Sequence, residues 1–155
     1  MKILNNLNDV SKNPKAITVG NFDGIHKGHQ ALINKTKEIS TKNNVESVIF
    51  TFNKLPKEIF SPDTVQRLYD NKVKESILSS YKIDTLLSID FNEIKDYSAD
   101  FFCEEILIKK LNTQYLIIGE NFKFGKDRSG DIEKLRKYDR KNTFELMVPE
   151  LKTYD

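Results

Sequence analysis

Short runs of apolar residues recur along the chain, separated by longer stretches in which apolar positions repeat every three or four residues. Four runs are nearly continuous and rich in β-branched, aromatic or leucine side chains, which is typical of strands buried on both faces of a parallel sheet. A fifth run, residues 144–148, alternates apolar and polar positions and predicts an edge strand. The four continuous runs are residues 16–19, 48–52, 86–89 and 115–118.

The stretches between the runs have the spacing of amphipathic helices. Leu32 and Ile39 fall on one face of a helix between the first two strands. Val73, Ile77 and Tyr81 lie at i, i+4 and i+8, which predicts the buried face of the next helix.

Polar residues mark the starts of two further helices. Ser98 is expected to cap a helix that carries Phe102 and Ile106, and Asp131 is expected to start a short last helix. The longest irregular stretch, residues 53–69, is predicted to be a loop.

The alternation of strand and helix patterns predicts the fold class. With right-handed crossovers, it indicates an α/β fold with an open, mostly parallel five-stranded sheet and helices on both faces. Ligands of such sheets bind beyond the carboxyl ends of the strands, near the point where the strand order reverses. We therefore expect the chemistry in the segments that follow the strands.

Composition and charge exclude several classes of protein. The 155 residues, 38% hydrophobic and 31% charged, suit one folded domain. A net charge of +2 offers no electrostatic basis for nucleic-acid binding. The single Cys103 excludes an internal disulfide and a multi-cysteine zinc site, and it fits a reducing compartment. We find no signal peptide and no apolar run near the roughly 18 residues that a membrane helix needs, so the prediction is a cytoplasmic protein without a membrane partner.

The most informative segment follows the first predicted strand and reads GNFDGIHKGH from Gly20 to His29. It holds the only two histidines of the chain, His26 and His29. Gly20 and Gly24 permit a tight turn, and Gly28 permits close approach of a phosphate to the start of the next helix, where unpaired N–H groups attract anions. Both imidazoles are therefore candidates to contact one phosphate. The alternatives are an ordinary turn with solvated histidines, or a metal site, for which no third ligand is evident nearby.

This segment resembles the Gly-x-Phe-Asp-Gly-x-His-x-Gly-His signature of the FAD synthetases, the adenylyltransferase modules of bacterial bifunctional riboflavin kinase/FMN adenylyltransferases. Residues 51–60 are similar to the family's Thr-Phe-x-Pro-His-Pro-x-x-x-Phe, with Lys54 and Leu55 in place of a Pro and the His. Residues 119–125 are similar to its Gly-x-[Asp/Asn]-Phe-x-Phe-Gly. The resemblance covers nearly the whole chain from about residue 16, and it implies a Rossmann-like nucleotidyltransferase fold.

The resemblance implies an activity and a set of site residues. Family members transfer AMP from ATP to FMN, with Mg²⁺, and release pyrophosphate; they need no protein nucleophile. His26, His29 and Asn121 take the catalytic positions by this resemblance, and no metal ligand is identified. The implied ATP site comprises Gly20, Asn21, Phe22, Asp23, Gly24, His26, Gly28 and His29. The implied FMN or FAD site comprises Phe52, Pro56, Phe60, Asn121 and Phe124.

Alternatives stay open for several of these residues. Aromatic faces stack on a flat isoalloxazine ring, but Phe52 and Phe60 are also explained as core residues. Asn121 is also explained by turn formation. Lys126 and Arg128 are candidates to approach phosphates, or are simply solvated.

The end of the chain departs from the family pattern. Family members continue into a Ser-Ser/Thr-x-x-Arg motif that also grips ATP phosphates, and then into a riboflavin kinase domain; residues 1–155 contain neither. We expect a single adenylyltransferase domain without kinase activity. The alternatives are a catalytically impaired or non-catalytic nucleotide- or flavin-binding fragment of the same fold, or another small-molecule adenylyl- or cytidylyltransferase. The sequence leaves the oligomeric state open.

Overall fold

The computed structural model describes residues 1–22, 27–54 and 64–150. Its strands are β1 (Lys2–Leu4), β2 (Lys15–Val19), β3 (Glu46–Lys54), β4 (Thr85–Asp90), β5 (Thr113–Ile117) and β6 (Glu145–Met147). Its helices are α1 (Lys27–Asn43), α3 (Thr64–Ser79), α4 (Ala99–Phe101), which continues as the π-helical segment η3 (Phe102–Lys110), and α5 (Ile132–Arg140). Short 3₁₀ turns are η1 (Leu7–Asp9), η2 (Phe91–Glu93) and η4 (Lys126–Arg128).

The strands form one sheet in the order β1-β4-β3-β2-β5-β6, and every pair is parallel. The chain builds outward from β2 through β3 to β4 and then crosses to β5, so the strand order reverses between β2 and β5. The predicted α/β fold with an open parallel sheet is confirmed. The sheet has one strand more than the five expected, because Lys2–Leu4 pairs with β4, with Ile3 beside Leu86. Lys2–Leu4 contributes only the adjacent pair Ile3 and Leu4 before the polar Asn5 and Asn6, so the sequence there shows no alternating pattern.

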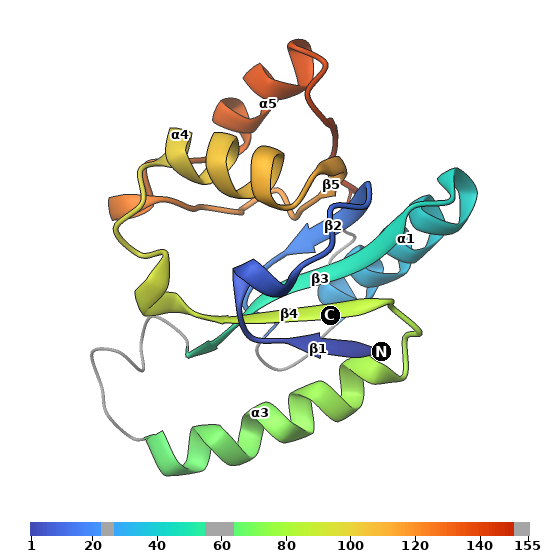
Figure 1. The fold of residues 1–155 in the computed structure, drawn as a ribbon, viewed down its shortest axis with the longest axis vertical. Coiled ribbons are helices and arrows are strands. Elements are labelled where there is room, and N and C mark those ends of the chain that lie inside the picture. Colours follow the sequence, from blue (N-terminus) through green and yellow to red (C-terminus); the bar gives the residue numbers. More distant parts are fainter. Residues whose placement is uncertain (23–26, 55–63, 151–155) are drawn as a thin grey trace.

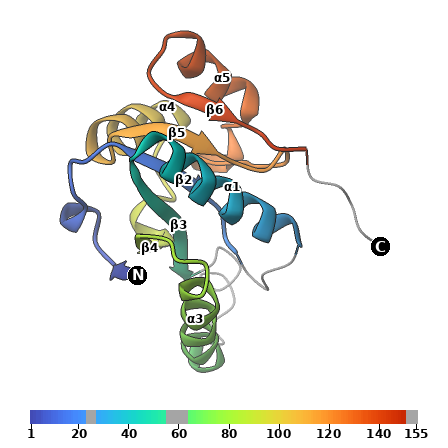
Figure 2. The same ribbon diagram turned by 90° about the vertical axis from the view of Figure 1, so that its right-hand side faces the viewer.

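Helices cover both faces of the sheet, as predicted (Figures 1 and 2). On one face, Ile17 and Val19 of β2 share a core with Leu107 of η3. On the other face, Ala16 of β2 packs with Leu32 of α1. The alternation along β2 follows from the two-residue period of a strand. None of the described helices combines the length and apolarity that crossing a membrane requires.

The predicted helix starts are confirmed by their caps. The Ser98 hydroxyl accepts a hydrogen bond from the Phe101 amide at 3.0 Å, at the start of α4. The Asp131 carboxylate accepts one from the Lys134 amide at 3.0 Å, at the start of α5. These bonds satisfy amides that have no partner within their own helix.

The predicted inner face of α3 is wrong by one residue. Val73 and Ile77 are 46% and 43% exposed, whereas Leu78 is fully buried against the sheet. One residue corresponds to about 100° around a helix, so the face that meets the sheet passes through Lys74 and Leu78 instead.

Both β3 and α3 extend into the range 53–69, for which the sequence predicted a loop. β3 extends through Lys54, which pairs with Asp90 of β4, and the Asn53 side chain donates to the Ser88 carbonyl at 3.2 Å. Helix α3 already begins at Thr64. Pro56 and Phe60 lie outside the described residues.

Candidate active site

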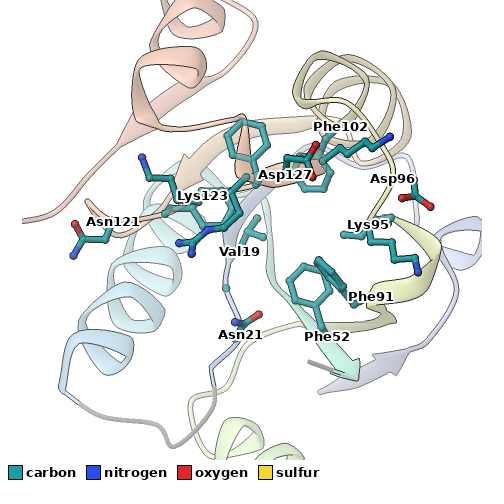
Figure 3. Close-up of a pocket in the computed structure, with 17 residues that line it drawn as sticks. Val19, Asn21, Phe52, Phe91, Lys95, Asp96, Phe102, Asn121, Lys123 and Asp127 are labelled. Atoms are coloured by element: carbon teal, nitrogen blue, oxygen red, sulfur yellow. The ribbon is translucent and has the colours of Figure 1, made fainter. Parts of the chain in front are cut away.

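A cavity of about 640 Å³ lies beyond the carboxyl ends of β2, β3 and β4 (Figure 3). Val19 ends β2, Phe52 lies near the end of β3, and Phe91 directly follows β4. The segment of residues 121–128, after β5, forms much of the remaining wall. The cavity therefore occupies the place where the strand order reverses, as expected for an open α/β sheet. Its volume lies within the roughly 300–1,000 Å³ of small-molecule sites.

Aromatic side chains form two groups around this cavity. Phe52 and Phe91 meet edge to face, with ring centroids 5.5 Å apart. Phe124 stacks on Phe122 at 5.5 Å and contacts Phe102 at the same separation. Phe52 and Phe124 are only 7% and 8% exposed. Both are thus core residues and cavity residues, and the two interpretations of Phe52 do not exclude each other.

Two glycines shape the segment that carries Phe124. Phe124 and Gly130 exchange backbone hydrogen bonds of 3.1 and 2.8 Å, and a Cβ on Gly130 would lie 2.5 Å from the Phe124 ring. Gly125 has a φ of +78°, and a Cβ there would lie 2.9 Å from the Ala99 amide nitrogen. These two glycines let the segment close tightly against the start of α4.

The cavity collects residues predicted for both ligands. It is lined by Gly20 and Asn21 of the predicted ATP site and by Phe52, Asn121 and Phe124 of the predicted FMN site. Figure 3 shows Asn21 and Asn121 at one side of the cavity, opposite Lys95 and Asp96.

The other described residues of the predicted ATP site lie outside the cavity lining. Gly28 and His29 occupy the first turn of α1 and do not line the cavity. Asp23, Gly24 and His26 lie outside the described residues.

Phe22 is a core residue and links the end of β2 to α1. It is fully buried in a cluster with Ile49 and Leu78, and its ring centroid lies 5.1 Å from that of His29. Its φ of 49° is left-handed, which is unusual for a bulky side chain. Packing around the Phe22 ring therefore holds a strained backbone conformation at the residue that begins the connection to α1.

Charged side chains surround the cavity. Lys126 and Arg128, which the sequence marked as candidates for phosphate contacts, both line it. Sequence reasoning missed several lining residues: Phe91, Ile94, Lys95, Asp96, Phe102, Phe122, Lys123 and Asp127. Four of them lie within residues 91–96, directly after β4. A search of every segment that follows a strand could therefore have found them.

A polar cluster fastens α5 to the start of α4. The Asp100 carboxylate accepts hydrogen bonds from the Lys134 ammonium at 2.8 Å and from the Tyr138 hydroxyl at 2.9 Å. These bonds hold the pKa of the Asp100 carboxyl below its usual 3.8. Burial, with a smaller contribution from Asp100, raises the pKa of the neighbouring Cys103 thiol to about 12. Cys103 is therefore neutral at pH 7, in agreement with a reaction that needs no thiol nucleophile.

The depressed pKa of Asp100 predicts a pH-dependent contribution to stability. Above pH 3.8 the carboxylate is charged in both folded and unfolded chains, and its bonds to Lys134 and Tyr138 favour the folded chain. As the pH falls below 3.8, the unfolded chain takes up the proton first, and this contribution is lost. Asp100→Asn should therefore be less stable than the wild type at pH 7, with a difference that shrinks through this range. Urea unfolding at a series of pH values measures it, and a difference independent of pH would contradict the assignment.

The fold and the position of the cavity first define the class of protein to which the chain belongs. An open parallel sheet with this strand order and a cavity at its reversal point is the architecture of Rossmann-like nucleotide-binding proteins. Within this class, the chain belongs to the FAD synthetase family, whose model matches residues 8–155.

The names of similar bacterial proteins agree with the family assignment. The chain is 37% identical over 146 residues to the bifunctional riboflavin kinase/FMN adenylyltransferase of Buchnera aphidicola subsp. Schizaphis graminum, covering 93% of this chain and 46% of that protein. It is 30% identical over 151 residues to the protein of the same name from Escherichia coli (strain K12), covering 94% and 48%. The chain thus spans about half the length of these curated relatives.

Solved structures share the fold. A crystal structure titled as a macrolide-efflux protein from Streptococcus pneumoniae superposes with a TM-score of 0.69 at 26% identity, covering 95% of this chain and 48% of that one. Pantothenate synthetase from Thermus thermophilus superposes with a TM-score of 0.54 at 14% identity, covering 97% and 61%. At this identity the second likeness concerns the fold only.

Proposed function

We propose that this chain transfers AMP from ATP to FMN, forming FAD and pyrophosphate. The observation that carries the proposal is the aromatic cavity of about 640 Å³ at the reversal point of the sheet, with family segments at its wall. A flat, largely apolar isoalloxazine ring suits a cavity lined by phenylalanine faces.

The flavin is proposed to occupy the aromatic cavity. Phe52 offers a buried ring near the end of β3, Phe124 offers one from the segment that follows β5, and Asn121 offers a polar group at the same cavity. By family resemblance, Pro56 and Phe60 complete this site.

The nucleotide is proposed to lie along the segment from Gly20 to His29. The N-terminus of α1 presents amides and the positive end of a helix dipole, which favour phosphate groups. His26 and His29 would hold the triphosphate, and Asn21 would line the passage between the two ligands.

The chemistry proposed needs no covalent enzyme intermediate. An oxygen of the FMN phosphate forms a bond to the α-phosphorus of ATP, and the bond from that phosphorus to the pyrophosphate oxygen breaks. The protein orients the two substrates and stabilises the charge that develops on the phosphoryl oxygens. Among the described residues, no three His, Cys, Asp or Glu side chains lie together as a metal site. The proposed Mg²⁺ is expected to enter with ATP, whose phosphates supply ligands.

These 155 residues are proposed to form one domain that carries the adenylyltransferase half of the two activities in the relatives' name. The expected cytoplasmic location and the absence of nucleic-acid binding stay predictions from the sequence.

The test is incubation of the protein with FMN, ATP and Mg²⁺, followed by chromatography for FAD and an assay for pyrophosphate. We expect equal amounts of both products, with the E. coli relative as the positive control. Phosphopantetheine and glycerol phosphate are tested as alternative acceptors. Pyrophosphate release with either of these but not with FMN would overturn the flavin assignment, and FMN binding without pyrophosphate release would indicate a non-catalytic module.

A further inference from the structure

Lys74 connects helix α3 to the carboxyl ends of two neighbouring strands. Its ammonium donates to the backbone oxygen of Asn21 at 2.5 Å, directly beyond β2. It lies 3.4 Å from the backbone oxygen of Phe52, near the end of β3. The Thr51 hydroxyl donates to the same Asn21 oxygen at 2.9 Å. The Asn21 carbonyl is thus held by two side chains from different elements.

The placement of a lysine on the inner face of α3 has a physical reason. Leu78, four residues further along, lies on the same helical face and is fully buried. Lys74 faces the edge of the sheet, where strands end and backbone carbonyls lose their ladder partners. An ammonium group carries three donors and can serve two such carbonyls at once. An apolar side chain at this position would leave these carbonyls without that donor.

The Asn21 carbonyl belongs to the turn that seats His29. The next residue, Phe22, is fully buried with a left-handed φ of 49°, and its ring contacts the His29 imidazole at a centroid distance of 5.1 Å. Leu78 belongs to the same core cluster as Phe22. Helix α3 therefore holds this turn at two consecutive residues, through the Lys74 hydrogen bond and through the packing of Leu78.

We infer that Lys74 is a positioning residue: by holding the Asn21 carbonyl it orients the Asn21–Phe22 turn and, through the Phe22 ring, the imidazole of His29. The expected effect of Lys74 on turnover rests on the proposed function. Its expected effect on the position of the His29 imidazole does not depend on any activity. The short contact to Asn21 is the important one, since the 3.4 Å contact to Phe52 lies at the outer limit of a hydrogen bond. The Asn21 contact acts on the turn that touches His29, whereas the weaker contact is to Phe52 of the proposed FMN site. Loss of Lys74 should therefore affect turnover more than FMN binding.

The test compares Lys74→Met, which keeps the length of the side chain, with Lys74→Arg and with Lys72→Met. Lys72 is exposed on the same helix and serves as the matched control. Because the chain has only two histidines, the imidazole resonances in an NMR spectrum reduce to two sets, and His29→Ala assigns them. We expect Lys74→Met to shift the His29 resonances without ligand, and Lys74→Arg and Lys72→Met to leave them near their wild-type positions.

Steady-state FAD formation provides the second readout. Misplacement of a site group by about 1 Å can cost on the order of a hundredfold in rate, so Lys74→Met should lower kcat by about ten- to a hundredfold with an unchanged KM for FMN. Unshifted His29 resonances in Lys74→Met, or equal shifts in Lys72→Met, would overturn the inference. If the wild type forms no FAD, the proposed activity fails, while the NMR comparison still decides whether Lys74 positions His29.

Discussion

Replacing His29 by alanine is expected to lower kcat for FAD formation by about 10²–10³ while the fold is retained. The proposed role of the imidazole is to hold the ATP phosphates and to stabilise charge that grows in the transition state. His29 lies in the first turn of α1, where amides and the helix dipole already favour an anion. Removing the imidazole leaves those groups in place, so binding of ATP should weaken less than turnover.

The same substitution should have a modest effect on stability. It removes the tilted ring pair that His29 forms with Phe22, and such pairs contribute about 0.5–1.5 kcal/mol. Asn34→Ala, at an exposed position of α1, is the matched control and should leave both kcat and the unfolding midpoint near wild type. Steady-state kinetics and thermal unfolding measure the two effects, and an unchanged kcat in His29→Ala would refute the assigned role.

Replacing Phe124 by alanine is expected to destabilise the chain by about 3–5 kcal/mol, as for other buried phenylalanines. The ring is 8% exposed, lies 5.5 Å from both Phe102 and Phe122, and covers Gly130. Its loss leaves a void in the wall of the cavity, and FMN affinity should fall together with stability. Urea unfolding and quenching of flavin fluorescence measure the two quantities.

Two further variants separate packing from flavin contact at this position. Phe124→Leu keeps most of the apolar volume, so we expect a much smaller loss of stability but a clear loss of FMN affinity, because the aromatic face is gone. Phe101→Ala removes a 41%-exposed ring whose aromatic contact is Tyr97, and it should cost less than about 1.5 kcal/mol. If Phe124→Leu binds FMN as tightly as the wild type, the ring does not contact the flavin.

Local patterns in the sequence determined most of the architecture. The continuous apolar runs became buried parallel strands, because their side chains meet helices on both faces. Ser98 and Asp131 became helix caps, because a short polar side chain satisfies free amides wherever a helix begins. The family itself was visible in three segments whose order and spacing follow the strands, and the family model agrees.

The tertiary structure decided what depends on contacts between distant residues. Helical periodicity in α3 favoured Val73 and Ile77 as the inner face, yet in the folded chain Leu78 is the buried residue and Lys74 donates to the Asn21 carbonyl beyond β2. Likewise, no local sequence pattern predicts that Phe91 and Phe124 line the same cavity. They do so only because the sheet brings the ends of β4 and β5 to the same side. The sequence by itself determined the strands, the helix starts and the family segments, because these depend on near neighbours along the chain. The residues of the cavity wall and of the inner face of α3 depend on contacts between segments that are distant in the sequence, and these contacts form only when the chain folds.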